Sequence, residues 1–192
     1  MKNVEQGLPP FPDRHDLESL QHHLQSLLVG AMQAMEGAGR TVCDFIDAVP
    51  WECTMDTARQ VRDESRHVEI FIKLLEHVKG YIGEAPETTI LWRCVCVETP
   101  EERVAPGVNR GLEGLACDLL PQLISLAKKI GDPVIERALD FLLADEFISV
   151  RMGSKWLREL MANAPERLRQ AVACQQSEVP VSIARDAPYA VV

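Results

Sequence analysis

The stretch DESRH at residues 63–67 governs the interpretation of this chain, because it sets a carboxylate and an imidazole three residues apart. It lies within residues 55–79, whose apolar side chains recur with the period of a helix. Side chains three apart share one face of a helix, so we expect Glu64 and His67 side by side. An inward-facing Glu-x-x-His is a metal-binding element of helix bundles, although a single copy also arises by chance. The rest of the chain must therefore supply further ligands.

The apolar pattern and the helix-terminating residues predict three further long helices, over residues 17–48, 108–130 and 133–161. Asp132 and Pro133 form a helix-start signal, because Asp caps free backbone N–H groups and Pro suits the first turn. The sequence therefore predicts an all-α protein built as a four-helix bundle. A long connection with three prolines would join the second and third helices, and a short C-terminal helix would cover residues 165–175. We expect an irregular N-terminal leader at 1–16, the bundle at 17–176 and an extended tail at 177–192.

The net charge of the chain, −9 over 192 residues, restricts the classes of partner. Nucleic acids and anionic membranes attract basic surfaces, so we expect neither as a partner. The apolar stretches are too short for a membrane span, and the first residues lack the apolar region of a secretory signal. We therefore expect a cytoplasmic protein.

Six cysteines are scattered along the chain, which fits reduced thiols better than a disulfide framework. Cys94 and Cys96 form a close pair, but a lone pair with this spacing makes a poor zinc site. We interpret these two residues as structural thiols, with a redox pair as the alternative.

Each of the four predicted helices offers one central carboxylate, namely Glu36, Glu64, Glu113 and Glu146. Carboxylate sites for two metal ions in bundles draw one Glu from each of two helices and one Glu-x-x-His from each of the other two. The order in this chain is Glu, Glu-x-x-His, Glu, Glu-x-x-Ser, with Ser149 where a second His is expected. Four carboxylates in an apolar interior are very unfavourable unless cations neutralise them. Oxygen ligands with one imidazole suit iron or manganese.

Four segments, read together, resemble the ferritin-like superfamily, and most closely its di-iron oxidase and oxygenase branch. They are residues 58–67 (ARQVRDESRH), 111–116 (GLEGLA), 144–146 (ADE) and 153–157 (GSKWL). The resemblance implies a ferritin-like bundle with two iron ions, or with manganese or a mixed pair. Their ligands would be Glu36, Glu64, His67, Glu113 and Glu146, with Glu64 and Glu146 bridging the two cations.

Ser149 departs from the pattern of that superfamily. The second cation is therefore expected to bind weakly, to be a harder ion such as manganese, to use another ligand such as Cys117, or to be absent.

The resemblance implies an oxidoreductase, an oxygenase or oxidase that activates dioxygen and oxidises a small organic substrate. The alternative is a non-catalytic ferritin-like protein that has a vestigial metal site and acts through partner binding, which Ser149 favours. An iron-oxidising or storage role ranks last, because the sequence shows no additional acidic patch. The extended termini and the apolar connection add a homodimer to these expectations. The sequence does not identify the substrate, because one fold of this kind hosts many reactions.

Overall fold

The computed structural model describes residues 17–84, 92, 103, 113–164 and 166 of the chain. Four α-helices account for most of this part, and the described residues include no β-strand. The helices are α1 (Leu17–Phe45), α2 (Trp51–His77), α5 (Glu113–Ile130) and α6 (Pro133–Leu160). The predicted all-α class with four long helices is therefore confirmed. None of the described helices combines the length and the apolar character that a membrane crossing requires.

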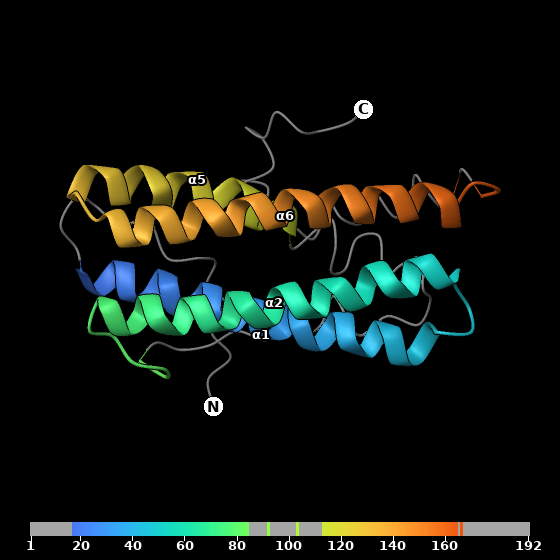
Figure 1. Cartoon of the computed structure of the whole chain (residues 1–192), viewed down its shortest axis with the longest axis horizontal. Coiled ribbons are helices and arrows are strands. Elements are labelled where there is room, and N and C mark those ends of the chain that lie inside the picture. The colour runs from blue at the N-terminus through green and yellow to red at the C-terminus, as the bar shows by residue number, and fades with distance from the viewer. Residues whose placement is uncertain (1–16, 85–91, 93–102, 104–112, 165, 167–192) are drawn as a thin grey trace.

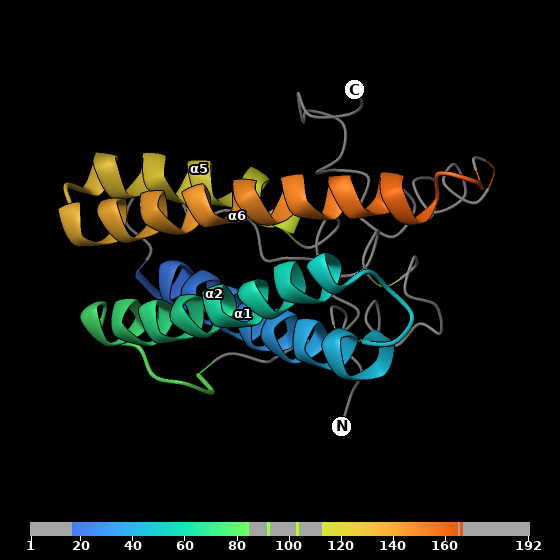
Figure 2. The same ribbon diagram turned by 45° about the vertical axis from the view of Figure 1, so that its right-hand side comes forward.

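The four helices form two hairpins that lie against each other (Figure 1 and, turned by 45°, Figure 2). In one hairpin α1 packs along α2, and in the other α5 packs along α6. The main contact between the two hairpins is made by α2 and α6. Any site shared by the hairpins is therefore built chiefly on these two helices.

Along the bundle, a polar layer separates two apolar regions. The larger region draws on all four helices, and its largest fully buried side chains are Leu24, Leu28, Leu75, Leu120, Leu123, Ile135, Leu139 and Leu142. The smaller region, beyond the polar layer, includes buried Cys53 and Trp156. Trp156 Nε1 donates a hydrogen bond of 2.8 Å to Asp56 Oδ2, which ties the end of α6 to the start of α2. The buried polar side chains of α2 and α6 are held between these regions.

The predicted start of the last long helix is confirmed in detail. Asp132 Oδ1 accepts hydrogen bonds from Val134 N at 3.0 Å and from Ile135 N at 3.1 Å, so it caps α6. Gly131 has a φ of 74°, a left-handed conformation that suits glycine and lets the chain reverse between α5 and α6.

The loop between α1 and α2 lies a few residues earlier in the chain than the apolar pattern predicted. α1 ends at Phe45 rather than at residue 48, and α2 begins at Trp51 rather than at residue 55. Pro50 explains the second difference, because its φ of −56° suits a helix start and its carbonyl accepts from Cys53 N at 2.9 Å.

Two described residues of the connection between α2 and α5 rest on α1. Trp92 N donates to Gln33 Oε1 at 2.8 Å, and the Trp92 side chain packs against Ala34 and Ala38. Arg103 forms an ion pair with Asp44, next to the end of α1. The leader at 1–16, the tail at 177–192 and, apart from residue 166, the short helix at 165–175 lie outside the described residues.

Candidate metal centre

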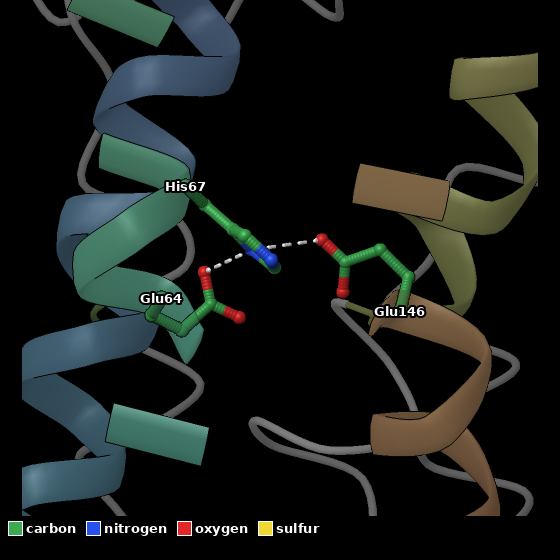
Figure 3. A group of neighbouring side chains, drawn as sticks. All are labelled: Glu64, His67 and Glu146. Atoms are coloured by element: carbon green, nitrogen blue, oxygen red, sulfur yellow. Dashed lines mark hydrogen bonds and ion pairs between the residues drawn. The ribbon is translucent and has the colours of Figure 1, made fainter. Parts of the chain in front are cut away.

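Three carboxyl groups and one imidazole meet between the two hairpins, within the polar layer. Glu64 and His67 come from α2, Glu113 from α5 and Glu146 from α6, and all four side chains are buried. Figure 3 shows Glu64 and His67 reaching from α2 toward Glu146 on the opposite helix. Helical spacing explains the local arrangement, because Glu64 and His67 lie one turn apart on the buried face of α2.

The separations within this group suit a single bound cation. The ligand atoms of Glu64, His67 and Glu146 all lie within 4.8 Å of one another. His67 Nδ1 is 3.2 Å from Glu64 Oε2 and 3.4 Å from Glu146 Oε1. Two donor atoms that are each about 2.1 Å from a cation lie about 3.0 Å apart at an octahedral edge and about 3.4 Å apart at a tetrahedral edge. Within the described residues, no other set of three His, Cys, Asp or Glu side chains meets the same distance.

The carboxyl groups affect one another strongly. Burial raises the pKa of Glu64 well above its usual range, and the charge of Glu113 raises it further. The pKa of Glu146 is raised for the same two reasons, with a further contribution from the charge of Glu64. Glu113 is therefore close enough to act on both neighbours and is a further candidate ligand, although the set whose ligand atoms lie within 4.8 Å of one another comprises Glu64, His67 and Glu146 without it.

No cationic side chain of the described residues offsets these acids. Arg59 and Arg66 pair with Asp63, and none of the Lys and Arg side chains that the structure describes forms an ion pair with the three buried glutamates. In addition, Glu64 Oε1 and Glu146 Oε2 are buried without a hydrogen-bond partner. Buried carboxyl groups without partners are strongly unfavourable unless they are protonated or bind a cation. The residues present therefore fit a bound divalent cation.

His67 presents its Nδ1 atom to the carboxyl groups and its Nε2 atom to Asp145. The Nε2 atom is 3.3 Å from Asp145 Oδ2, and Arg66 Nη2 donates to the same oxygen at 2.8 Å. Burial lowers the pKa of His67 even though the neighbouring carboxylates oppose this shift. We therefore assign a neutral imidazole with its proton on Nε2, which directs the Nδ1 lone pair into the site. An outer carboxylate that fixes a ligand imidazole in this way is typical of metal centres.

The structure corrects the expected role of Glu36. Its side chain is exposed on α1 and takes no part in the group of buried acids. At this level α1 turns Ala34 and Ala38 toward the interior, and both are buried. Glu36 is two residues from each of them, which is about 200° around the helix, so it faces water. α1 therefore contributes small side chains where the sequence predicted a ligand.

Ser149 and Cys117 are buried next to the site but add no ready ligand. Ser149 lies one turn beyond Glu146 on the buried face of α6, where a second imidazole was expected. Cys117 lies one turn beyond Glu113 on α5, and burial, reinforced by the charge of Glu113, raises its pKa to about 12. Cys117 is thus a neutral thiol at ordinary pH, and a neutral thiol is a weak ligand.

Sequence reasoning missed two residues that contact the ligands. Gln60 donates a hydrogen bond to Glu113, and Asp145 accepts one from His67. Both had a detectable signal: Gln60 is one turn before Glu64 on the same face of α2, and Asp145 stands next to Glu146, as Asp63 stands next to Glu64.

Comparison with protein families identifies one match. A family model described as "Protein of unknown function (DUF455)" matches residues 4–178 of this chain, so the chain belongs to that family. Comparisons with curated proteins and with solved structures find no match.

Proposed function

We propose that this member of the DUF455 family is a metal-dependent oxidoreductase that activates dioxygen to oxidise a small organic substrate. One or two iron or manganese ions would bind among Glu64, His67, Glu113 and Glu146. The proposal includes the resemblance to the ferritin-like superfamily, whose di-iron members place glutamates and histidines at such positions of a helix bundle.

One observation supports the proposal most directly. Glu64, His67 and Glu146 converge from two hairpins, and their donor atoms lie within 4.8 Å of one another, as the ligands of one metal ion would. In addition, one carboxylate oxygen of Glu64 and one of Glu146 are buried without a hydrogen-bond partner. A purely structural polar cluster would satisfy those oxygens, because buried polar groups in folded proteins are nearly always hydrogen-bonded. Oxygen donors with a single imidazole favour iron or manganese over metals that prefer thiolates.

The side chains of the site have separable roles in this proposal. Bound iron or manganese supplies the one-electron redox chemistry that reactions of dioxygen require. The three glutamates supply the negative charge that holds the cation, and His67 adds its Nδ1 lone pair. Asp145 fixes the imidazole ring through Nε2, and the apolar regions on either side of the polar layer limit the entry of water.

Metal analysis tests the binding part of the proposal. Protein purified aerobically from cells grown with added iron or manganese is expected to carry one to two equivalents per chain. Glu64→Gln should lose most of this metal, and Glu36→Gln should keep it, because Glu36 is exposed and outside the site. A metal-free wild-type chain whose thermal unfolding does not respond to added Fe(II) or Mn(II) would rule out the proposal.

A second function, a metal-stabilised but non-catalytic protein that acts through partner binding, is favoured by two positions of the template. Glu36 is exposed and Ser149 has no side-chain nitrogen, so α1 and the second half of the α6 motif supply no ligand of the expected type. Anaerobic loading with Fe(II) followed by exposure to dioxygen separates the two functions. The oxidoreductase is expected to consume dioxygen in proportion to bound iron, whereas the non-catalytic protein would be stabilised by the metal without consuming dioxygen. The small substrate, the homodimer and the cytoplasmic location stay predictions of the first function.

A further inference from the structure

We propose that Gln60 is a positioning residue that restricts Glu113 to binding the metal through one oxygen and so keeps a coordination position open for an exogenous ligand. This inference rests on the proposed metal site. The inference extends the proposed metal site, because it names the side chain that controls access to the cation. It also assigns a role to Gln60, a residue that the ligand template does not contain.

The contact that carries the inference is buried and direct. Gln60 is 1% exposed, and its Nε2 atom donates a hydrogen bond to Oε1 of Glu113. The two residues are 53 positions apart, so the bond joins α2 to α5 across the site. Gln60 also lies one turn from Glu64, on the same buried face of α2. It is therefore placed beside the ligands rather than in the surrounding apolar layers.

The consequence for Glu113 follows from how carboxylates bind metals. A carboxylate occupies two positions on a cation when both oxygens bind and one position when a single oxygen binds. A hydrogen bond to an ionised group is stronger than one between neutral groups, so displacing Gln60 from Oε1 is unfavourable. Because Gln60 occupies one lone-pair site of Oε1, Glu113 is expected to bind the metal through Oε2, and the position that Oε1 would fill stays open.

The chemical nature of Gln60 suits this role. Its amide carries no charge, so it holds Glu113 without cancelling the negative charge that attracts the cation. An Arg or Lys at this place would pair with Glu113 and reduce the negative charge of the site. By contrast, Arg66 acts outside the group of ligands, on Asp63 and Asp145.

Substitution by Cobalt(II) and titration with azide provide the test. Co(II) fills first-row metal sites, and its visible absorption weakens as the coordination number rises to six. Azide serves as a small anion that occupies an open position. At saturating Co(II), Gln60→Leu is expected to weaken the visible absorption and to lower azide affinity at least about tenfold, because both oxygens of Glu113 are then free to bind.

A matched control separates positioning from loss of a buried amide. Gln21 is a buried glutamine of α1, and its Nε2 donates a hydrogen bond of 2.8 Å to Val78 O. By helical rise, Val78 lies about 16 Å from His67 along the axis of α2, so this hydrogen bond is far from the site. Gln21→Leu should lower stability but leave the Co(II) spectrum and the azide affinity as in the wild type. If Gln60→Leu does not fold, Gln60→Met, which preserves the length of the side chain without the donor, carries the same expectations.

The outcomes are distinguishable. A wild-type chain that binds no Co(II) would refute the metal site and this inference together. A wild-type chain that binds Co(II) and azide, with a Gln60→Leu variant of unchanged spectrum and azide affinity, would refute the role of Gln60 alone. Equal effects of Gln60→Leu and Gln21→Leu would also refute it, because the role would then be structural.

Discussion

Replacing Glu64 by Gln should stabilise the metal-free protein and at the same time abolish most of its response to metal. Glutamine has nearly the shape of glutamate, and its amide can donate to His67 Nδ1, as a protonated Glu64 would. The substitution removes a titratable group whose ionisation burial makes unfavourable, but it also removes an anionic ligand. A residue with only a packing role would not show effects of opposite sign in the two states.

The magnitude for the metal-free state follows from the raised pKa of Glu64. The folded protein retains a proton that the unfolded chain releases above the ordinary value of 4.5, so the stability of the metal-free protein falls as pH rises above that value. Above that value, a carboxyl that the fold keeps protonated lowers stability by about 1.4 kcal/mol for each further pH unit. Glutamine does not titrate, so Glu64→Gln should recover this loss, and the recovered stability should grow as pH rises above 4.5.

For the metal-bound state, the change in the free energy of unfolding follows from the linkage between metal binding and folding. A ligand present at about 100 times its dissociation constant stabilises the fold by about 2.7 kcal/mol, and each tenfold loss of affinity removes about 1.4 kcal/mol of that effect. Urea unfolding, followed by circular dichroism with chelator and then with Mn(II), measures both states. Glu36→Gln, an exposed control, should stay within about 0.5 kcal/mol of the wild type in each. The reasoning fails if Glu64→Gln is less stable than the wild type in chelator, or if Mn(II) stabilises both equally.

Two further substitutions test the site and the fold separately. Ser149→His adds an imidazole one turn from Glu146, so equilibrium dialysis with Mn(II) should find a higher number of tightly bound ions, and an unchanged number would mean that residue 149 does not reach the site. Asp132→Ala removes the cap of α6 and should cost about 1–2 kcal/mol at neutral pH. Burial raises the pKa of Asp132, but hydrogen bonds from His77 and from the backbone outweigh burial and lower this pKa below the ordinary value of 3.8. The contribution of Asp132 to the stability of the fold is therefore present above pH 3.8 and is lost as pH falls through the lowered pKa. Urea unfolding of both proteins at a series of acidic pH values should therefore show the difference between them disappear.

Local sequence rules predicted those parts of the structure that depend on residues close together in the chain. The cap at Asp132 and the shared face of Glu64 and His67 each involve residues within one helical turn. Such features need only the geometry of a helix, so they were predicted without knowledge of tertiary packing. The convergence of Glu113 and Glu146 was predicted from a template of helix bundles, and the burial of both residues agrees with it.

The orientation of α1 could not be predicted in the same way. Met32 and Met35 are the larger apolar side chains at its centre, yet Met32 is 41% exposed and the buried face is formed by Ala34 and Ala38. Alanine occurs on buried and exposed helix faces alike, so it does not identify the buried face, but it allows close packing, here against Val61 of α2 and Trp92 of a distant segment. A rotation set by such packing depends on residues far apart in sequence. This rotation of α1 exposes the side chain of Glu36 to solvent. Packing between residues far apart in sequence also creates the contact between Gln60 and Glu113.

The position of the acids in the fold gives a physical reason for a metal rather than a proton to be their natural partner. They lie between the two hairpins, where polar contacts join His67 and Arg66 of α2 to Asp145 and Glu146 of α6. Protonation would neutralise the glutamates, but a protonated carboxyl would link the hairpins only through hydrogen bonds, such as the one between Glu64 and Glu113. A divalent cation would neutralise two charges and link ligands from both hairpins at once, so the binding energy of the proposed metal would also contribute to folding. The rest of the described chain follows ordinary rules of capping and apolar packing, and such a local conflict within a consistent fold is expected where a protein performs its function.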